Sequence, residues 1–272
     1  MHAIHNIIVY GSDKRQLALQ ELFKQAGAVT VSPTRYNESD IQYCQEQEAG
    51  CTILLPVPCP GEIREQILKD AAPGSLILGG NLPSEFVARC LKQGLLVYDY
   101  LDSPSVVIQN GIATAEGAIC EAIRHSPWNL YQHNCLVMGY GRCGSVLADR
   151  LLGMGAYVIV SARDPQKAAK AQVMGCSLLS DNTDLSQCYF VFNTVPAPVL
   201  TSSLLNRLPG DAVIIDIASA PGGCDFTYCE KKGLQAALYP GLPAKYAPKS
   251  SAEIIFKHLN EVFQIGSKGK KT

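Results

Sequence analysis

Residues 134–163 contain the feature that most constrains the fold of this chain. An apolar run is followed by glycines spaced as G-x-G-x-x-G, then by a helix-compatible stretch and a second apolar run. This order within about 30 residues is typical of a dinucleotide-binding βαβ unit rather than of an ordinary βα turn. The first glycine permits the turn, the second lets a pyrophosphate approach the backbone, and the third lets helix and strand pack closely. The residues of this turn that we expect to bind the cofactor are Gly139, Gly141, Arg142, Cys143 and Gly144.

The end of the second strand, Ser161-Ala162-Arg163, indicates which dinucleotide binds. An NAD enzyme has Asp or Glu about 20 residues after the turn, where the carboxylate binds the ribose 2′-hydroxyl. A carboxylate would repel a 2′-phosphate, whereas a serine hydroxyl and a guanidinium would bind it through charge-assisted hydrogen bonds. Lys167 adds a further positive charge one turn later. We therefore expect Ser161, Ala162 and Arg163 to bind NADP in preference to NAD; the alternative is that Arg163 only caps a surface turn.

The composition argues against several other classes of protein. Lys and Arg number 23 and Asp and Glu 24, so the chain offers neither a broad basic face for nucleic acid nor a patch for a membrane. No apolar run reaches 18 residues, and the first residues lack the basic segment and cleavage site of a secretory signal. The eleven cysteines include no C-x-x-C pair, and the five histidines form no ligand cluster. We therefore expect a cytoplasmic protein with reduced thiols and no bound metal.

Apolar strands alternate with helical segments along both halves of the chain, which predicts an α/β fold with parallel sheets. We expect two Rossmann-like domains joined by crossing helices around a central cleft. The first crossing helix is expected at residues 118–125, with Thr114 as its N-cap. The predicted organisation is an N-terminal substrate or partner domain at 1–110, a linking helix at 111–130, an NADP-binding domain at 131–247, a helix returning to the first domain at 248–265, and a tail at 266–272.

Three further loops follow predicted strands of the second half, at residues 193–198, 216–223 and 239–245. Each is expected at the carboxyl end of a parallel strand, where open α/β sheets bind ligands. Their glycine and proline content also fits ordinary turns, so this alternative stays open. The additional cofactor contacts that we expect from these loops are Thr194, Val195, Pro196, Ala218, Leu242 and Pro243.

Together these segments resemble the A-subunit family of dipicolinate synthase. The resemblance covers nearly the whole chain in order, and one departure is Ser-Ser-Ala-Glu at residues 250–253, where the family tends to have Thr-Ala-Gly. More distantly, the layout is similar to that of two-domain 2-hydroxyacid dehydrogenases and adenosylhomocysteinases. The segments that carry the resemblance are residues 11–16 (similar to G-G-D-x-R-Q), 110–118 (similar to N-x-I-x-T-x-E-G-A), 139–144, 161–163, 193–197, 216–223, 240–243 and 247–249.

The resemblance implies an oxidoreductase of sporulation that oxidises dihydrodipicolinate, a small dicarboxylate, to dipicolinate, with NADP accepting the hydride. It also implies a partner, the flavoprotein-like B-subunit of dipicolinate synthase, in the cytoplasm of the mother cell, and we expect a homo-oligomer. Two alternatives stay open. One is another NADP-dependent oxidoreductase of a small 2-hydroxy or 2-imino acid, and the other is a nucleotide-binding subunit that is inactive without its partner.

Such a reaction needs groups that bind two carboxylates and a group that removes one proton. None of the five histidines lies on an expected ligand loop, so Asp216 and Glu116 are the candidate bases; alternatively, each only caps a turn or helix. Lys245 could equally be a surface lysine. The candidates for carboxylate binding are Lys14, Arg15, Arg142, Ser219, Lys245 and Lys249. The residues that we take as catalytic candidates are Ser219, Asp216, Glu116 and Lys245.

Overall fold

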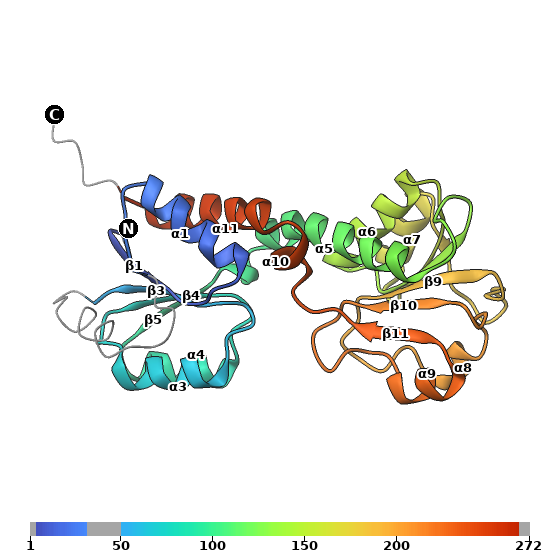
Figure 1. Cartoon of the computed structure of the whole chain (residues 1–272), viewed down its shortest axis with the longest axis horizontal. Helices are drawn as coiled ribbons and strands as arrows, with labels where there is room; N and C mark the ends of the chain where they lie inside the picture. Colours follow the sequence, from blue (N-terminus) through green and yellow to red (C-terminus); the bar gives the residue numbers. More distant parts are fainter. Residues whose placement is uncertain (1–3, 32–49, 267–272) are drawn as a thin grey trace. The chain divides into compact units, whose positions relative to one another are not determined.

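The computed structural model describes residues 4–31 and 50–266, which fall into two compact units. Unit 1 comprises Met1–Val107 and Ala247–Thr272, and unit 2 comprises Ile108–Tyr246. Each unit contains one sheet with helices on both faces (Figure 1). All strand pairs that the structure describes are parallel, which confirms the predicted α/β class with two Rossmann-like domains. None of the described helices combines the length and apolarity needed to cross a bilayer.

The sheet of unit 1 has the strand order β2-β1-β3-β4-β5. Its strands are short apolar runs, and the central ones are buried on both faces because helices cover both sides, as parallel sheets require. The strands are β1 (Asn6–Val9), β2 (Val29–Val31), β3 (Thr52–Leu54), β4 (Leu76–Gly79) and β5 (Leu96–Asp99). The helices are α1 (Lys14–Gln25), α3 (Gly61–Asp70), α4 (Ser84–Lys92), the 3-10 turn η1 (Tyr100–Asp102) and α11 (Pro248–Phe263).

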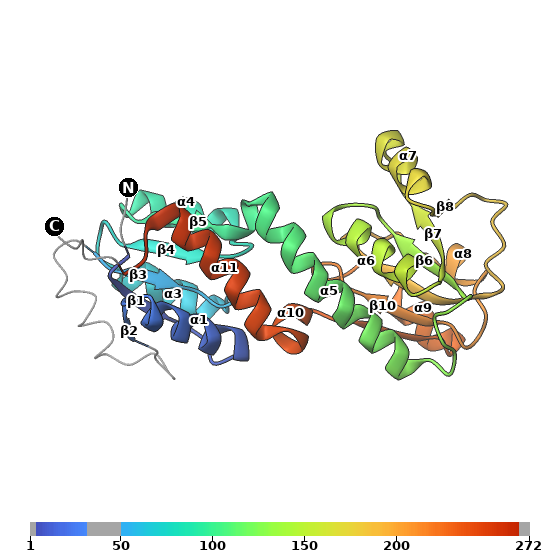
Figure 2. The same cartoon turned by 90° about the horizontal axis from the view of Figure 1, so that it is seen from above.

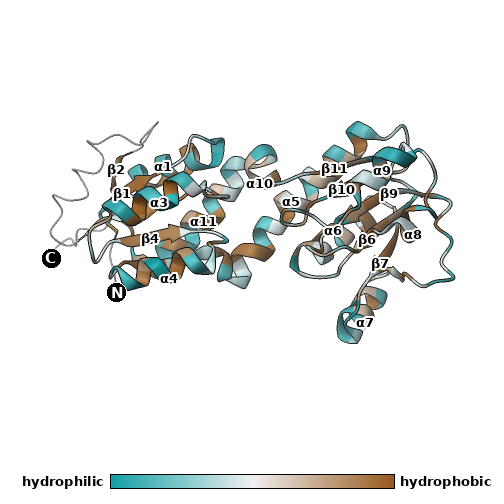
Figure 3. Cartoon of the chain, turned by 90° about the horizontal axis from the view of Figure 1, so that it is seen from below, coloured by the Kyte–Doolittle hydropathy of each residue, from teal (hydrophilic) through white to brown (hydrophobic). Residues whose placement is uncertain are grey.

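Helix α11 returns from the far end of the chain to complete the core of unit 1. Figures 1 and 2 show it beside α1. Ala252, Ile255 and Leu259 of α11 are fully buried in one cluster with Leu19 and Phe23 of α1. Helices α3 and α4 cover the opposite face of the sheet with a separate cluster. The hydropathy colouring in Figure 3 shows hydrophobic strands in the middle of the unit and helices that carry both hydrophilic and hydrophobic residues.

The sheet of unit 2 has the strand order β11-β10-β9-β6-β7-β8. Read from the β8 edge, this is the order 3-2-1-4-5-6 of dinucleotide-binding folds, with its switch point between β6 and β9. The strands are β6 (Asn134–Met138), β7 (Tyr157–Ser161), β8 (Ser177–Leu178), β9 (Cys188–Asn193), β10 (Val213–Asp216) and β11 (Gln235–Leu238). The helices are α5 (Pro104–His125), whose residues before Ile108 belong to unit 1, α6 (Arg142–Gly153), α7 (Pro165–Val173), α8 (Ser202–Leu205), α9 (Phe226–Lys232) and α10 (Leu242–Tyr246).

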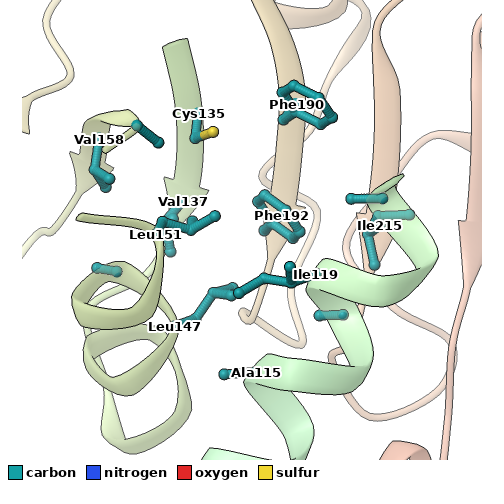
Figure 4. Close-up of a cluster of buried hydrophobic side chains, with 14 of the residues drawn as sticks. Ala115, Ile119, Cys135, Val137, Leu147, Leu151, Val158, Phe190, Phe192 and Ile215 are labelled. Atoms are coloured by element: carbon teal, nitrogen blue, oxygen red, sulfur yellow. The ribbon is translucent and has the colours of Figure 1, made fainter. Parts of the chain in front are cut away.

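The main core of unit 2 lies between its sheet and the helices α5 and α6. Ile119 of α5 and Leu147 of α6 meet over Phe192, which projects from β9 (Figure 4). Figure 4 also shows Val137 and Phe190 lining the same layer from β6 and β9. The packing of both helices on one face of the strands fixes the direction in which α6 leaves the glycine turn.

The structure corrects the predicted start of the first crossing helix. Helix α5 begins at Pro104, so Thr114 lies inside it and is not an N-cap; the Thr114 hydroxyl donates to the Asn110 carbonyl at 3.1 Å. Asn110 and Gly111 suggested a loop because both residues favour turns. In the folded chain, position 111 lies against α6: a Cβ there would lie 3.5 Å from the Val146 side chain, an ordinary van der Waals contact.

Two other helix boundaries differ from expectation. Helix α6 begins at Arg142, so the residues predicted to lie in the glycine turn extend into the first helical turn. The loop expected at residues 239–245 instead contains the short helix α10, on which Leu242, Pro243 and Lys245 lie. The predicted tail lies, except for Gly266, outside the described residues.

The packing of α11 predicts a large loss of stability on truncation of its core side chains. Leu259→Ala should lower the free energy of unfolding by about 2–5 kcal/mol, because it removes transfer energy and leaves a cavity. Urea denaturation followed by circular dichroism measures this change. The matched control is Glu261→Ala, an exposed position on the same helix, which should change stability by less than about 0.5 kcal/mol. Equal losses for both variants would contradict the packing.

Candidate dinucleotide site

The turn between β6 and α6 has the backbone that its glycines allow. Gly139 has φ +93°, and a Cβ there would lie 2.7 Å from both Thr194 Oγ1 and Val195 Cγ2. The Gly139 N–H donates to the Ser161 carbonyl at 2.9 Å, and the Thr194 hydroxyl donates to the Met138 carbonyl at 2.9 Å. These bonds join the carboxyl ends of β6, β7 and β9 at the point where the strand order reverses, which is where such sheets bind dinucleotides.

The two later glycines of the turn have different surroundings. A Cβ at Gly144 would lie 2.2 Å from the Gly139 carbonyl oxygen, so no side chain fits there. A Cβ at Gly141 would have no neighbour within 4 Å. Gly141 is the N-cap of α6, and the N–H groups of the first helical turn point outward from it. Gly144 therefore allows α6 to contact the end of β6 closely, and Gly141 leaves room for a ligand at the positive end of α6.

A cavity of about 320 Å³ lies at these strand ends. Arg163 and Lys167 line it together with the glycine turn. Asp164 also lines it, but this carboxylate accepts a hydrogen bond from Gln166 N at 2.9 Å and lies 3.9 Å from Lys167 Nζ. The predicted cofactor residues that line this cavity are Gly139, Gly141, Ser161, Ala162, Arg163, Thr194, Val195 and Pro196.

A second cavity of about 450 Å³ adjoins the first and shares Tyr140, Gly141 and Lys167 with it. Its charged lining side chains are Arg142, Lys167 and Lys170, all cationic. Sequence reasoning missed Lys170, although it lies three residues after Lys167 and therefore on the same side of α7. Together the two cavities present a positively charged surface on either side of Gly141, which suits a ligand that carries several phosphates.

The remaining predicted cofactor residues do not line either cavity. Gly144 and Cys143 lie in the first turn of α6, and burial raises the pKa of the Cys143 thiol. Leu242 is buried in the main core of unit 2, where Pro243 follows it in α10. Ala218 is buried as well, and its N–H donates to a side chain of β10.

Asp216 binds the ends of neighbouring strands together. It has no exposed surface, and its Oδ1 accepts from Asn193 Nδ2 and Ala218 N, both at 3.0 Å. Its Oδ2 accepts from Gly223 N at 2.7 Å. A fully buried carboxylate whose oxygens already accept three hydrogen bonds has no exposed surface for a substrate. This geometry favours the alternative in which Asp216 shapes the loop over the role of proton acceptor.

The other catalytic candidates lie in different surroundings. Ser219 is exposed on the loop after β10, where its carbonyl accepts from Gly222 N at 2.9 Å. Glu116 is exposed in the middle of α5, so it neither precedes nor caps that helix. Among the carboxylate-binding candidates, Arg15 is buried in unit 1 and donates to the Val57 carbonyl at 3.1 Å. Lys14 and Lys249 are exposed near the starts of α1 and α11.

A charged cluster around Glu121 was not predicted. The Glu121 carboxylate is 2 % exposed and accepts from Lys245 Nζ and from the Tyr246 hydroxyl, both at 2.5 Å. Arg124 Nη1 and His125 Nε2 lie 3.8 and 3.5 Å from its other oxygen. The sequence signal was Glu followed by two basic residues three and four positions later, which share one side of a helix. The link to Lys245 could not be seen because the partners are far apart in sequence.

The protonation of this cluster follows from its partners. Burial acts to raise the pKa of Glu121, but the hydrogen bonds from Lys245 and Tyr246 and the charge of Lys245 outweigh it and lower the pKa. The hydrogen bond to Glu121 raises the pKa of the Lys245 ammonium. Lys245 is 53 % exposed and remains charged, so it combines a fixed position with access to solvent.

These features define the class of the protein. Residues 111–221 match the family described as the NAD binding domain of D-isomer specific 2-hydroxyacid dehydrogenases. The glycine turn, the strand order and this match identify unit 2 as a nicotinamide dinucleotide-binding domain of the dehydrogenase type of oxidoreductase.

The whole chain gives a narrower assignment. It is 35 % identical to the dipicolinate synthase A-subunit of Bacillus subtilis (strain 168), over 94 % of this chain and 95 % of the relative. A crystal structure of the dipicolinate synthase A-subunit from Bacillus halodurans matches with TM-score 0.83 and 27 % identity, over 96 % of this chain and 98 % of the other. The crystal structure of the Bacillus subtilis protein matches in fold with TM-score 0.79 and 24 % identity, over 96 % of each chain. The chain belongs to the A-subunit family of dipicolinate synthase, as the sequence resemblance predicted.

The two glycines of the turn yield a paired prediction. Gly141→Ala places a methyl group in the open space where a dinucleotide would lie, so it should weaken dinucleotide binding at least tenfold and leave the melting temperature nearly unchanged. Gly144→Ala should lower the melting temperature, because the methyl group meets the Gly139 carbonyl oxygen. Titration calorimetry and thermal unfolding measure the two effects. A lower melting temperature for Gly141→Ala, together with an unchanged one for Gly144→Ala, would contradict the geometry.

The Glu121 cluster predicts a pH dependence of stability. The pKa of Glu121 is lower in the folded chain than the ordinary value of an unfolded chain. At a pH above the unfolded pKa, such a carboxyl stabilises the fold; this stabilisation is lost as the pH falls through the folded pKa. Below about pH 4.3, the ordinary value for Glu, the unfolding free energy should therefore fall more steeply for the wild type than for Glu121→Gln. Urea unfolding at several pH values measures both slopes. Glu116→Gln, the same change at an exposed site of α5, should follow the wild type.

Proposed function

We propose that this chain oxidises dihydrodipicolinate to dipicolinate with NADP as the hydride acceptor. The observation that carries the proposal is the alignment with a relative from dipicolinate synthase over 94 % of the chain at 35 % identity. The reaction removes two hydrogens from the ring of the substrate: one leaves with its electron pair as a hydride, and the other leaves as a proton. The ring becomes aromatic, which supplies much of the driving force.

The residues at the end of β7 support NADP as the cofactor. Arg163 and Lys167 line the cavity beside Ser161, and Lys170 and Arg142 line the adjoining one. A 2′-phosphate would find charge-assisted hydrogen bonds here, and the carboxylate of Asp164 is already engaged with the first turn of α7 and with Lys167. The bound nicotinamide ring supplies the hydride acceptor, and this chain supplies the cationic surface that holds the phosphates.

Two side chains of unit 2 have the chemistry that the substrate needs. The Lys245 ammonium is held by Glu121 and Tyr246 yet half exposed, so we assign it to a substrate carboxylate rather than to proton removal. The exposed hydroxyl of Ser219 follows β10 and suits a second carboxylate contact. Asp216 is buried and Glu116 lines neither dinucleotide cavity, so we assign the acceptance of the released proton to water. Water is a weak base, and a step that ends in aromatisation needs only a weak base.

The name of the relatives implies a partner of a second kind. We propose that this chain works with a flavoprotein-like B-subunit, as part of a homo-oligomer, in the mother-cell cytoplasm of a spore former. The test is the appearance of reduced nicotinamide absorbance when dihydrodipicolinate and NADP are added to the chain alone and to the chain with its flavoprotein-like partner. Absence of turnover in both mixtures, with NADP binding intact, would overturn the proposed reaction. Turnover of a 2-hydroxy acid instead would point to the alternative oxidoreductase.

The cofactor proposal predicts a change of preference on charge reversal at one residue. Arg163→Asp should weaken NADP binding by about 10- to 100-fold, the loss expected for a charge-assisted hydrogen bond, and NAD binding much less. Titration calorimetry with both dinucleotides measures the ratio. The matched control is Lys231→Asp, the same charge reversal on the exposed side of α9, which should change neither affinity. Equal losses for NADP and NAD would show that Arg163 does not contact the 2′-phosphate.

A further inference from the structure

Two cysteine thiols of unit 2 lie in contact at the start of α9. The sulfurs of Cys224 and Cys229 are 3.5 Å apart, and neither belongs to a disulfide. Asp225 is the N-cap of α9, so Cys224 is the residue before the cap and Cys229 is the fourth residue of the helix. Apolar side chains at these two positions often pack together and fix the entry of the chain into a helix. Two thiols at the same positions can also join.

The two thiols differ in exposure and in freedom to move. Cys229 is 1 % exposed and lies in the α9 helix, packed in one cluster with Leu205 and Leu234. Cys224 is partly exposed on the loop between β10 and α9. Burial raises the pKa of both thiols, so the reactive thiolate is scarce at neutral pH and the pair reacts slowly. A reagent in solvent therefore reaches Cys224 first.

We propose that Cys224 and Cys229 form a reversible disulfide that weakens dinucleotide binding to unit 2, whichever dinucleotide and substrate the chain uses. The oxidant is a small disulfide such as oxidised glutathione. The Cys224 thiolate attacks one sulfur of the small disulfide and releases a first thiolate. The Cys229 thiolate then attacks Cys224 Sγ, which forms the new S–S bond and releases a second thiolate. The two released thiolates take up the two protons that the cysteines lost, so two electrons pass from the pair to the small disulfide.

The arrangement of the two sulfurs suits this second attack. Their separation of 3.5 Å is close to the range of about 3–3.5 Å from which bonds form without rearrangement. A disulfide bond is about 2.05 Å long, so the sulfurs must approach each other by about 1.5 Å. Because the core holds Cys229 in its helix, we assign most of this movement to Cys224 and the loop that carries it.

The backbone before Cys224 touches one wall of the dinucleotide cavity. The Gly223 carbonyl accepts a hydrogen bond from Val199 N at 3.1 Å. A Cβ at Gly223 would lie 2.3 Å from the Ala197 carbonyl oxygen and 2.5 Å from the Val195 carbonyl oxygen, so these backbones meet without a gap. Val195 and Val199 line the cavity that contains the glycine turn. A movement of Cys224 is therefore passed to the residues that would contact a dinucleotide.

The first test is detection of the disulfide in the full chain after treatment with oxidised glutathione, alkylation and digestion with trypsin. Cleavage after Arg207 and Lys231 releases one peptide, residues 208–231, which contains both cysteines of the pair and no other cysteine. Mass spectrometry should show that this peptide has lost two hydrogens and carries no alkyl group. Dithiothreitol should restore two alkylated thiols. An unchanged peptide, or one that carries only a glutathione adduct, would overturn the proposal.

The second test compares dinucleotide binding to the reduced and the oxidised wild type by titration calorimetry with NADP and with NAD. The oxidised chain should bind the preferred dinucleotide about tenfold more weakly, as expected for a wall of the site displaced by about 1 Å. Reduction should restore the affinity. Equal affinities of the two forms would overturn the regulatory role. A preference for NAD would contradict the cofactor proposed above and leave this comparison unaffected.

Variants separate the pair from the other thiols of the chain. Cys224→Ser and Cys229→Ser cannot form the disulfide, so treatment with oxidised glutathione should leave their dinucleotide affinity unchanged. Cys120→Ser, which removes another partly exposed thiol of unit 2, should lose affinity on oxidation as the wild type does. Circular dichroism checks that each variant is folded, and the wild-type comparison needs no variant. A loss of affinity on oxidation of folded Cys224→Ser would assign the effect to other cysteines and overturn the proposal.

Discussion

The approach of α6 to the glycine turn is the contact on which the dinucleotide site depends. The Gly139 carbonyl oxygen occupies the place where a Cβ of residue 144 would lie, so the first turn of the helix sits directly on the end of β6. This contact fixes the point at which α6 begins, and hence where its unpaired N–H groups lie. The hydroxyl of Thr194 and the carbonyl of Ser161 hold the same turn from β9 and β7. Positive charge at the cavity therefore comes from a rigid backbone as well as from side chains.

Two buried carboxylates serve unit 2 in different ways. Asp216 accepts three hydrogen bonds from one amide side chain and two backbone N–H groups, and it thereby fixes the loop that carries Ser219. Glu121 instead binds Lys245 and Tyr246 and anchors α10 to α5. Burying a polar group is costly unless it is hydrogen-bonded, and both carboxylates accept several hydrogen bonds. The exposed residues Ser219 and Lys245 are thus positioned by buried carboxylates.

Local sequence patterns were sufficient to predict the parts of this structure that are formed by residues close in sequence. The glycine spacing identified β6, α6 and β7, and the ending at Arg163 placed that side chain beside the turn. Pairings between distant segments were inaccessible: Lys245 meets Glu121 only because α10 folds against α5. The start of α5 was misjudged because Asn110 and Gly111 have turn propensities that packing against Val146 overrides. The residue type of Asp216 fitted both a base and a turn cap, and its burial and three hydrogen bonds could be seen only in the folded chain.

The contribution of α11 to unit 1 has a consequence for synthesis on the ribosome. Unit 2 is continuous in sequence, whereas the core of unit 1 needs Ile255 and Leu259 beside Leu19 and Phe23. Because a chain emerges from its N-terminus, all of unit 2 leaves the ribosome before the last helix of unit 1 is made. The N-terminal strands must therefore wait with one apolar face covered only by α1 while the middle of the chain folds. During this interval the apolar surface that α11 buries in the folded chain stays open to solvent.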